Sequence, residues 1–254
     1  RRDARRLIGV ESGVDHTAAM ERFSRQRARE LEALNLSGFV FKKDSPSCGM
    51  ERVRIYHEHG KPTRDGVGMF ARVFMGRFPL IPVEEEGRLS DAVLRDNFLE
   101  RVFGYRRWQD LMQGRITRGA IVAFHTKHKY SLLAHSPTHY RTMGRLVSNA
   151  DSYAPTALAQ RYGELFMDAL KVGATVRTHA NVLQHIMGHI SKRLDADQRA
   201  ELYGANEHYR TGSTPLIVPL TLITHYARLF KIAYILNQAY LAPYPKELML
   251  RNPV

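Results

Sequence analysis

The segment KKDSPSCGM (42–50) has the residues best suited to chemistry. It contains Cys48, the only cysteine in the 254 residues. Ser45 and Ser47 can donate hydrogen bonds to a sulfur or an oxyanion, and the basic side chain of Lys43 favours a thiolate. From these residues alone, Cys48 is a nucleophile, a metal ligand, or an inert cysteine in a turn built from serine, proline and glycine.

Each active role for Cys48 requires partners. A nucleophilic thiol needs a general base, and His57 and His59 on the next extended segment are close enough in sequence to be considered. An iron–sulfur cluster is held mainly by several cysteine thiolates, so one cysteine cannot hold a cluster by itself. The residues alone leave these alternatives open.

A second segment, FHTKHKYSLLAHSPTHYRTMGRL (124–146), is rich in basic and aromatic residues. Ser136 is a natural helix N-cap and Pro137 suits the first helical position, so we expect two helices that meet there. Such a pair suits phosphate contacts and base stacking, although a polar helix hairpin is the alternative. The candidate nucleic-acid contacts are His125, Lys127, His128, Lys129, Arg141 and Arg145.

The elements before residue 90 alternate between strand and helix. Apolar runs predict strands over 36–43 and 79–87, and the helical pattern predicts helices over 15–34 and 69–78. This order favours an α/β domain with a parallel sheet, which would place Cys48 just after the carboxyl end of a strand, where open sheets bind ligands. The acidic run 84–86 is expected to be a solvated strand end.

The rest of the chain has helical periodicity throughout, and we expect an all-α domain. The proposed domains are 1–112 and 113–254, with a helix from Ser90 onward between them. The predicted helices of the second domain are 118–134, 137–149, 155–171, 175–193, 195–203 and 215–240.

The overall composition is typical of a globular protein with a polyanionic partner. The net charge is +13, and residues 111–254 contain 17 Lys and Arg against 8 Asp and Glu, a net charge of +9. Charged side chains such as Arg228 and Lys231 interrupt the apolar stretch 215–241, so we expect a buried helix and no membrane association. A single cysteine fits a reducing cytoplasm. The sequence has no initiator methionine, so we expect it to be part of a longer chain.

Several motifs resemble two known families. The segments GVDHT (13–17), KKDSPSCGM and DGVGMFARVF (65–74) resemble the C-terminal part of the TudS-like thiouracil desulfurases. The segment 124–146, NVLQHIMGHISKRL (181–194) and YRTGSTPLIVPLTLITHY (209–226) resemble the YbgA-like all-helical domain. The two families occur as a fusion in this order, so together they cover nearly the whole chain.

The desulfurase resemblance implies a [4Fe–4S] cluster that binds the sulfur of a thiolated base at an open iron. Cys48 is then the metal ligand, and Ser45 and Ser47 are the catalytic residues. Asp15 and Thr17, with Lys43, are expected to bind the substrate. The fusion implies that the substrate is 4-thiouridine in tRNA, held by the helical domain.

This sequence departs from the family pattern. The resemblance requires two more cysteines and the glutamate of a Cys-Pro-Glu motif, and neither is present. We therefore expect the chain by itself to be inactive and the full-length parent to be the enzyme. The alternatives are a non-catalytic nucleic-acid-binding or regulatory module, and a hydrolase that uses Cys48 with His57.

Overall fold

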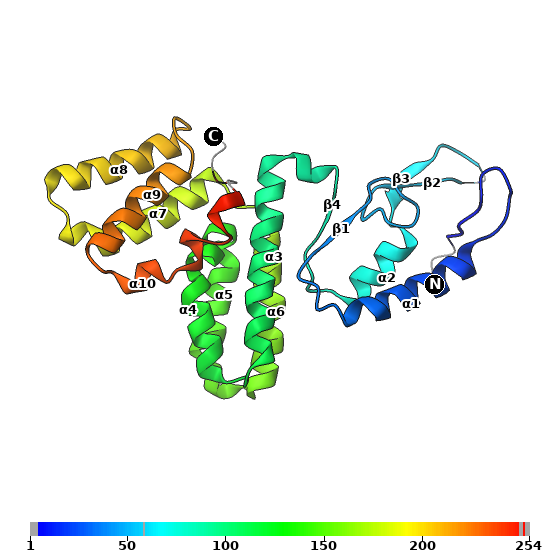
Figure 1. The fold of residues 1–254 in the computed structure, drawn as a ribbon, viewed down its shortest axis with the longest axis horizontal. Helices are drawn as coiled ribbons and strands as arrows, with labels where there is room; N and C mark the ends of the chain where they lie inside the picture. The colour runs from blue at the N-terminus through cyan, green and yellow to red at the C-terminus, as the bar shows by residue number, and fades with distance from the viewer. Residues whose placement is uncertain (1–4, 58, 249–250, 252–254) are drawn as a thin grey trace. The chain divides into compact units, whose positions relative to one another are not determined.

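The computed structural model describes residues 5–57, 59–248 and 251. The chain forms two units, of which the first ends at Asp91 and the second begins at Ala92. Each unit is described by itself. The first is a small α/β unit and the second is helical (Figure 1).

The α/β unit has two helices and two small sheets. Strands β1 and β4 pair in parallel, and β2 pairs with β3 in antiparallel fashion. Helix α1 packs against α2. The elements are α1 (Thr17–Glu32), β1 (Phe39–Phe41), β2 (Val53–Ile55), β3 (Thr63–Gly66), α2 (Met69–Arg77), β4 (Val83–Glu85) and a 3₁₀ turn (Arg88–Ser90).

Aromatic side chains form the core of this unit. Phe41 on β1 and Phe74 on α2 are fully enclosed, with ring centroids 5.6 Å apart in an edge-to-face arrangement. Phe70 packs one turn earlier on α2, and Phe39 lies 4.4 Å from Phe74. Burial of these rings stabilises the contact between β1 and α2. The Cys48 loop follows β1 and accepts hydrogen bonds from the first turn of α2, so the core fixes two elements that the loop contacts.

The α/β class, the parallel sheet and the helical C-terminal part are all confirmed. The structure differs in detail. Strand β3 was not among the expected strands, and Ile8 makes an isolated bridge to Asp15. The strand expected over 36–43 is the three-residue β1.

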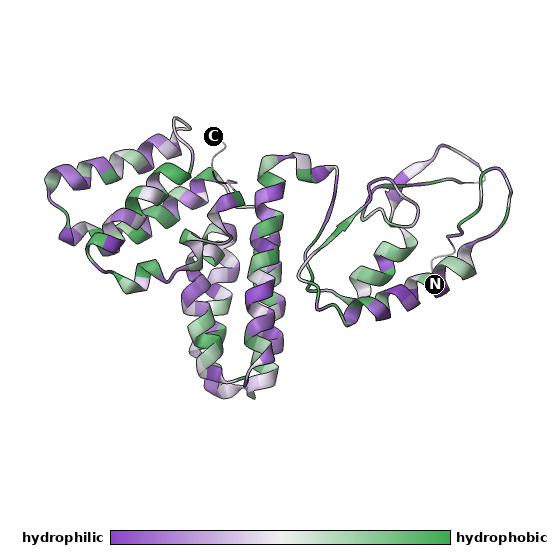
Figure 2. Ribbon diagram, viewed as in Figure 1, coloured by the Kyte–Doolittle hydropathy of each residue, from purple (hydrophilic) through white to green (hydrophobic). Residues whose placement is uncertain are grey.

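The second unit contains eight α-helices within its described residues. Helix α4 packs against α5, α6 and α7, while α3 packs against α6. Polar and apolar residues are mixed along most of these helices, as expected for helices that bury one face (Figure 2). The helices are α3 (Ala92–Gln113), α4 (Arg118–His135), α5 (Pro137–Ser148), α6 (Pro155–Lys171), α7 (Val176–Ile190), α8 (Ala196–Arg210), α9 (Ile217–Leu229) and α10 (Ala233–Leu236).

Local sequence signals account for several helix ends. The Ser136 hydroxyl accepts a hydrogen bond from the His139 amide, and Pro137 begins α5, as predicted. Thr175 and Asp195 form capping boxes at the starts of α7 and α8. The sequence therefore specifies where these helices begin.

Two helix predictions in this unit were wrong in extent. The single helix expected over 215–240 ends at Leu229, because the backbone turns at Lys231, whose φ is 52°, before α10 begins. Helix α8 continues to Arg210, beyond the predicted end at 203. The compact units divide at residue 91, because α3 packs within the helical unit, and the domain boundary expected near 112 stays a prediction.

No helix in the described part of the chain is both long enough and apolar enough to span a bilayer.

Candidate functional site

The Cys48 loop is organised by hydrogen bonds among its own side chains. The Cys48 amide donates to the Ser45 hydroxyl oxygen at 3.2 Å, and the two serine hydroxyls lie 3.0 Å apart. The Ser47 hydroxyl donates to the Cys48 sulfur at 3.4 Å. The sulfur is half-buried, so it is reachable and has a hydrogen-bond donor beside it. This geometry suits a thiolate or a sulfur ligand.

The same loop packs against the start of helix α2. The Pro46 carbonyl accepts from the Met69 amide at 3.1 Å, and the Ser47 carbonyl accepts from the amides of Phe70 and Ala71. These carbonyls satisfy the amide groups that a helix leaves without intrahelical partners. The first turn of α2 therefore fixes the backbone that carries Cys48.

Gly68 permits this close packing. A Cβ atom at Gly68 would lie less than 3.0 Å from the carbonyl oxygen of Ser47 and the amide nitrogen of Cys48. The Gly68 amide also donates to the Gly49 carbonyl at 2.8 Å. The glycine in DGVGMF is thus required by the approach of the cysteine loop.

The predicted substrate-binding residues near the N-terminus contact each other. The Asp15 carboxylate accepts from the Thr17 amide at 2.9 Å and pairs with Arg6 at 2.8 Å. The Thr17 hydroxyl accepts from the Leu7 amide. Hydrogen bonds from Thr17 and then Arg6 lower the pKa of Asp15 to about 2. These contacts organise the entry to α1, and the substrate role of both residues stays a prediction.

The remaining predicted residues of this unit have other partners. The Lys43 amide donates to Glu86, while the Nε2 atom of His57 lies 3.1 Å from the Thr63 hydroxyl on β3. The partner of His57 is therefore Thr63, and its role as a base for Cys48 stays a prediction. His59 is exposed.

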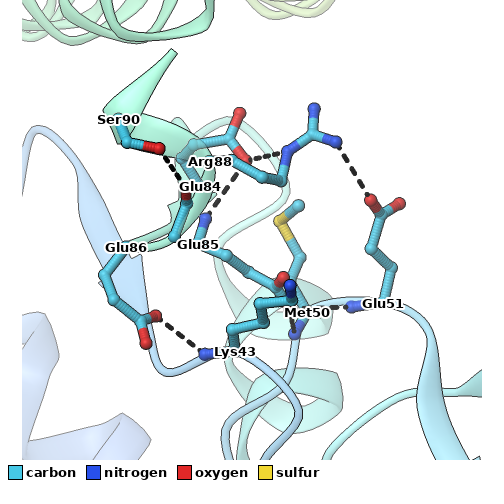
Figure 3. Close-up of polar contacts among 9 residues, drawn as sticks. Lys43, Met50, Glu51, Glu84, Glu85, Glu86, Arg88 and Ser90 are labelled. Atoms are coloured by element: carbon cyan, nitrogen blue, oxygen red, sulfur yellow. Dashed lines mark hydrogen bonds and ion pairs between the residues drawn. The ribbon is translucent and has the colours of Figure 1, made fainter.

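The acidic run 84–86 at the end of β4 contradicts part of its sequence-based interpretation. Glu84 and Glu85 are only 4% and 3% exposed, so the expected solvated strand end is wrong for these two residues, whereas Glu86 is exposed. Glu85 accepts hydrogen bonds from the amides of Met50 and Glu51, directly after the cysteine loop (Figure 3). These carboxylates belong to the site, and their position at the carboxyl end of a predicted strand was the signal that could have identified them.

In the helical unit, the structure encloses two predicted nucleic-acid contacts. His125 and His128 are 8% and 2% exposed. His125 faces the Tyr162 hydroxyl, and His128 stacks on Phe124 and donates to its carbonyl at 2.9 Å. Burial lowers the pKa of His125 to about 4 and that of His128 to about 3. Both are neutral core residues, so neither is available for a surface contact with RNA.

The predicted cations on the same two helices lie at or near the surface. Lys127 on α4 and Arg141 and Arg145 on α5 are exposed. Lys129 is partly buried, and its ammonium group lies 5.1 Å and 4.9 Å from the ring centres of Tyr130 and Tyr234. Three of the six predicted residues are thus exposed cations on α4 and α5, which we call together the α4–α5 basic surface (Lys127, Arg141 and Arg145).

No sequence pattern indicated the buried ionic group of this unit. Glu100 on α3 lies 3.3 Å from the Nε2 atom of His135 and 3.7 Å from a guanidinium nitrogen of Arg251. The Nδ1 atom of His135 donates to the Val172 carbonyl at 2.6 Å. Burial disfavours the charged imidazole, but Glu100 outweighs it and raises the pKa of His135. This group joins α3, α4 and the C-terminal segment.

The described residues do not complete a metal site. No group of three or more His, Cys, Asp or Glu side chains in the described ranges could hold a metal ion. Cys48 supplies one thiolate, whereas the cluster implied by the resemblance needs three cysteines. The donor set of this chain therefore does not fit a [4Fe–4S] cluster by itself.

The fold and loop define a class of protein: an α/β unit that presents a cysteine loop, followed by an all-helical unit. Residues 1–86 match the family model described as 2-thiouracil desulfurase. Residues 129–245 match a model described as a protein of unknown function, DUF1722. No solved structure matches the chain.

A curated relative defines the family more closely. The chain is 32% identical over 163 residues to the uncharacterized protein YbgA of Escherichia coli K12, an alignment that covers 62% of this chain and 94% of that protein. The chain therefore belongs to the YbgA family, and a region that matches the 2-thiouracil desulfurase model precedes its helical domain.

Proposed function

We propose that the protein to which this chain belongs is an iron–sulfur-dependent desulfurase that removes sulfur from thiolated uracil, with 4-thiouridine in tRNA as its substrate. The Cys48 loop is the observation that carries this proposal. Within a region that matches the desulfurase family, its half-buried sulfur has a hydroxyl donor at 3.4 Å.

On this proposal, Cys48 is one thiolate ligand of the cluster, and the hydroxyls of Ser45 and Ser47 act on the sulfur or oxygen of the substrate. The other ligands come from residues outside this sequence, because the chain has one cysteine. The contribution of this chain is a thiol held beside two hydroxyl groups.

The helical unit is proposed to bind the tRNA. Residues 111–254 have a net charge of +9, and the α4–α5 basic surface is accessible to phosphate groups. Asp15, Thr17 and Lys43 remain the proposed contacts to the thiolated base. The reducing cytoplasm is the proposed location, since a thiolate ligand has to remain reduced.

The test begins with anaerobic reconstitution of the complete reading frame with iron and sulfide. We expect bound iron and loss of 4-thiouridine absorbance from thiolated tRNA, and we expect Cys48→Ala to abolish both. Glu30→Ala, on the exposed surface of α1, is the control. A Cys48→Ala protein that keeps its iron and its desulfurase activity would contradict the proposal.

The incomplete donor set favours a second candidate, a nucleic-acid-binding or regulatory module without catalysis. This candidate predicts that the complete protein binds tRNA but leaves its 4-thiouridine unchanged after reconstitution. The same two measurements, RNA binding and sulfur removal, therefore separate the candidates.

A further inference from the structure

Glu85 is a buried carboxylate at the end of β4 that binds the backbone of the cysteine loop. Its Oε1 atom accepts from the Met50 amide at 2.8 Å and is 3.4 Å from the Glu51 amide (Figure 3). Met50 follows Cys48 by two residues. Since Glu85 is 3% exposed, solvent does not compete strongly for these hydrogen bonds.

The two neighbouring glutamates extend this contact. Glu86 accepts from the Lys43 amide at 2.7 Å, at the other end of the loop. Glu84 pairs with Arg88 at 2.7 Å, and Arg88 reaches the carboxylate of Glu51 at 3.4 Å. The end of one strand thus binds the loop both before and after Cys48 (Figure 3).

The topology makes this arrangement effective. Strand β4 pairs in parallel with β1, and β1 leads directly into the cysteine loop. The end of β4 therefore lies beside the start of the loop, and successive carboxylates can reach its backbone amides. Within the loop, Gly49 donates to the Ser45 carbonyl at 2.8 Å, so a backbone fixed at Met50 also fixes the turn that carries Cys48.

The geometry points to Glu85 as a positioning residue that holds the Cys48 sulfur beside the Ser47 hydroxyl. Its catalytic meaning rests on the proposed desulfurase function, but its effect on the loop does not. Without an acceptor at this position, the amides of Met50 and Glu51 lose their partner, and the loop opens. The half-buried sulfur then becomes more accessible.

The single cysteine permits a direct test on the whole chain. The rate of alkylation by iodoacetamide reports on Cys48 alone, and hydrogen exchange reports on the amides of Met50 and Glu51. For Glu85→Ala, we expect both rates to rise about tenfold, since a buried hydrogen bond to a charged group is lost. Glu85→Gln keeps an acceptor oxygen, so both rates should remain within about twofold of the wild type.

Two further variants serve as controls for this experiment. Glu85→Asp keeps the charge but shortens the side chain, so its rates should lie between those of Ala and the wild type, which also provides a result if Glu85→Ala does not fold. Glu30→Ala is the matched surface control and should change neither rate. Unchanged or slower alkylation in folded Glu85→Ala or Glu85→Asp overturns the inference, as does a Gln variant that behaves like Ala.

These readouts need no cluster and no substrate. If the desulfurase proposal fails, the alkylation and exchange rates still decide whether Glu85 positions Cys48. If the loop rates are unaffected while the reconstituted protein desulfurises tRNA, this inference alone fails. When both hold, Glu85→Ala lowers desulfurase activity and Glu85→Gln restores it.

Discussion

Two glycines near Cys48, Gly49 and Gly68, have no space for a side chain. At Gly49, a Cβ atom would lie less than 3.0 Å from a Val53 methyl group and the Ser45 carbonyl oxygen. At Gly68, it would meet the backbone of Ser47 and Cys48. Backbone atoms cannot move aside as the end of a flexible side chain can. The turn within the loop therefore depends on the absence of a side chain at Gly49, and the contact of the loop with α2 depends on its absence at Gly68.

The first prediction concerns this packing. Gly68→Ala should destabilise the α/β unit by about 1–3 kcal/mol, because the added methyl group overpacks against the Cys48 backbone. Gly76→Ala, on the same helix α2, is the matched control, since nothing lies within 4 Å of its Cβ position. Helix propensity should make that variant more stable by roughly 0.5–1 kcal/mol. Denaturant unfolding followed by circular dichroism measures both, and equal midpoints for the two variants would contradict the packing argument.

At the scale of elements, helices α4 and α5 separate two kinds of polar residue. His125 and His128 face the interior of the unit, whereas Lys127 and Arg141 lie on the surface. Ser136 is both the C-cap of α4 and the N-cap of α5, so the helices follow each other with a fixed turn. Any RNA contact of this pair therefore depends on the exposed cations.

The second prediction tests that surface. Lys127→Ala combined with Arg141→Ala should weaken tRNA binding and reduce the slope of log K against log salt by roughly 0.7–0.9 for each lost phosphate contact. The matched control is Lys171→Ala combined with Arg210→Ala, which also removes two exposed positive charges, here ones paired with Asp168 at 2.8 Å and with Glu207 at 2.5 Å. Fluorescence anisotropy at several salt concentrations measures the slope. An unchanged slope would show that the RNA binds elsewhere.

At the scale of the whole molecule, buried histidines make the stability of the helical unit depend on pH. Burial lowers the pKa of His179 to about 3, as it does for His128, while that of His125 is about 4. The folded unit keeps these imidazoles neutral, but the unfolded chain protonates them below a pKa of about 6.5. The pKa of His135 shifts in the opposite direction, because Glu100 raises it despite burial.

The third prediction follows from linkage. As the pH falls from about 6.5 toward 4, the free energy of unfolding should fall, by at most about 1.4 kcal/mol per pH unit for each neutral histidine. Above pH 6.5, the contribution of His135 should be lost as the pH rises through its raised pKa. Trp108, the only tryptophan, is 4% exposed in this unit, so its fluorescence follows the unfolding.

Two variants test whether His128 contributes to the loss of stability at acidic pH. His128→Gln should reduce the slope between pH 6.5 and 4, because one neutral buried imidazole is removed. His185→Gln, at an exposed position on α7, should leave the slope unchanged. Identical pH profiles for the wild type and His128→Gln would rule out His128 as a source of the acid sensitivity.

Most of the element order could be predicted from the sequence, because periodicity, caps and breakers act locally. Ser136 with Pro137 defines the junction of α4 and α5, and the alternation of strand and helix before residue 90 indicates the α/β unit. Lys127 and Arg141, predicted as nucleic-acid contacts, are exposed, and their contact with RNA stays a prediction. Strand β3 and the end of α9 were not predicted, since the short pairing of β2 with β3 and the turn at Lys231 depend on tertiary packing.

The sequence by itself determined which residues can do chemistry, that an α/β region precedes a helical one, and that the helical part is basic. Only the tertiary structure decided which polar residues are enclosed. The sequence pattern predicts that Glu85 is solvated, yet it is buried beside the cysteine loop, at the end of the strand β4 that pairs in parallel with β1. The sequence pattern predicts that His128 contacts RNA, yet its ring stacks on Phe124 in the core. Burial depends on neighbours distant in sequence, and local residue patterns do not specify those neighbours.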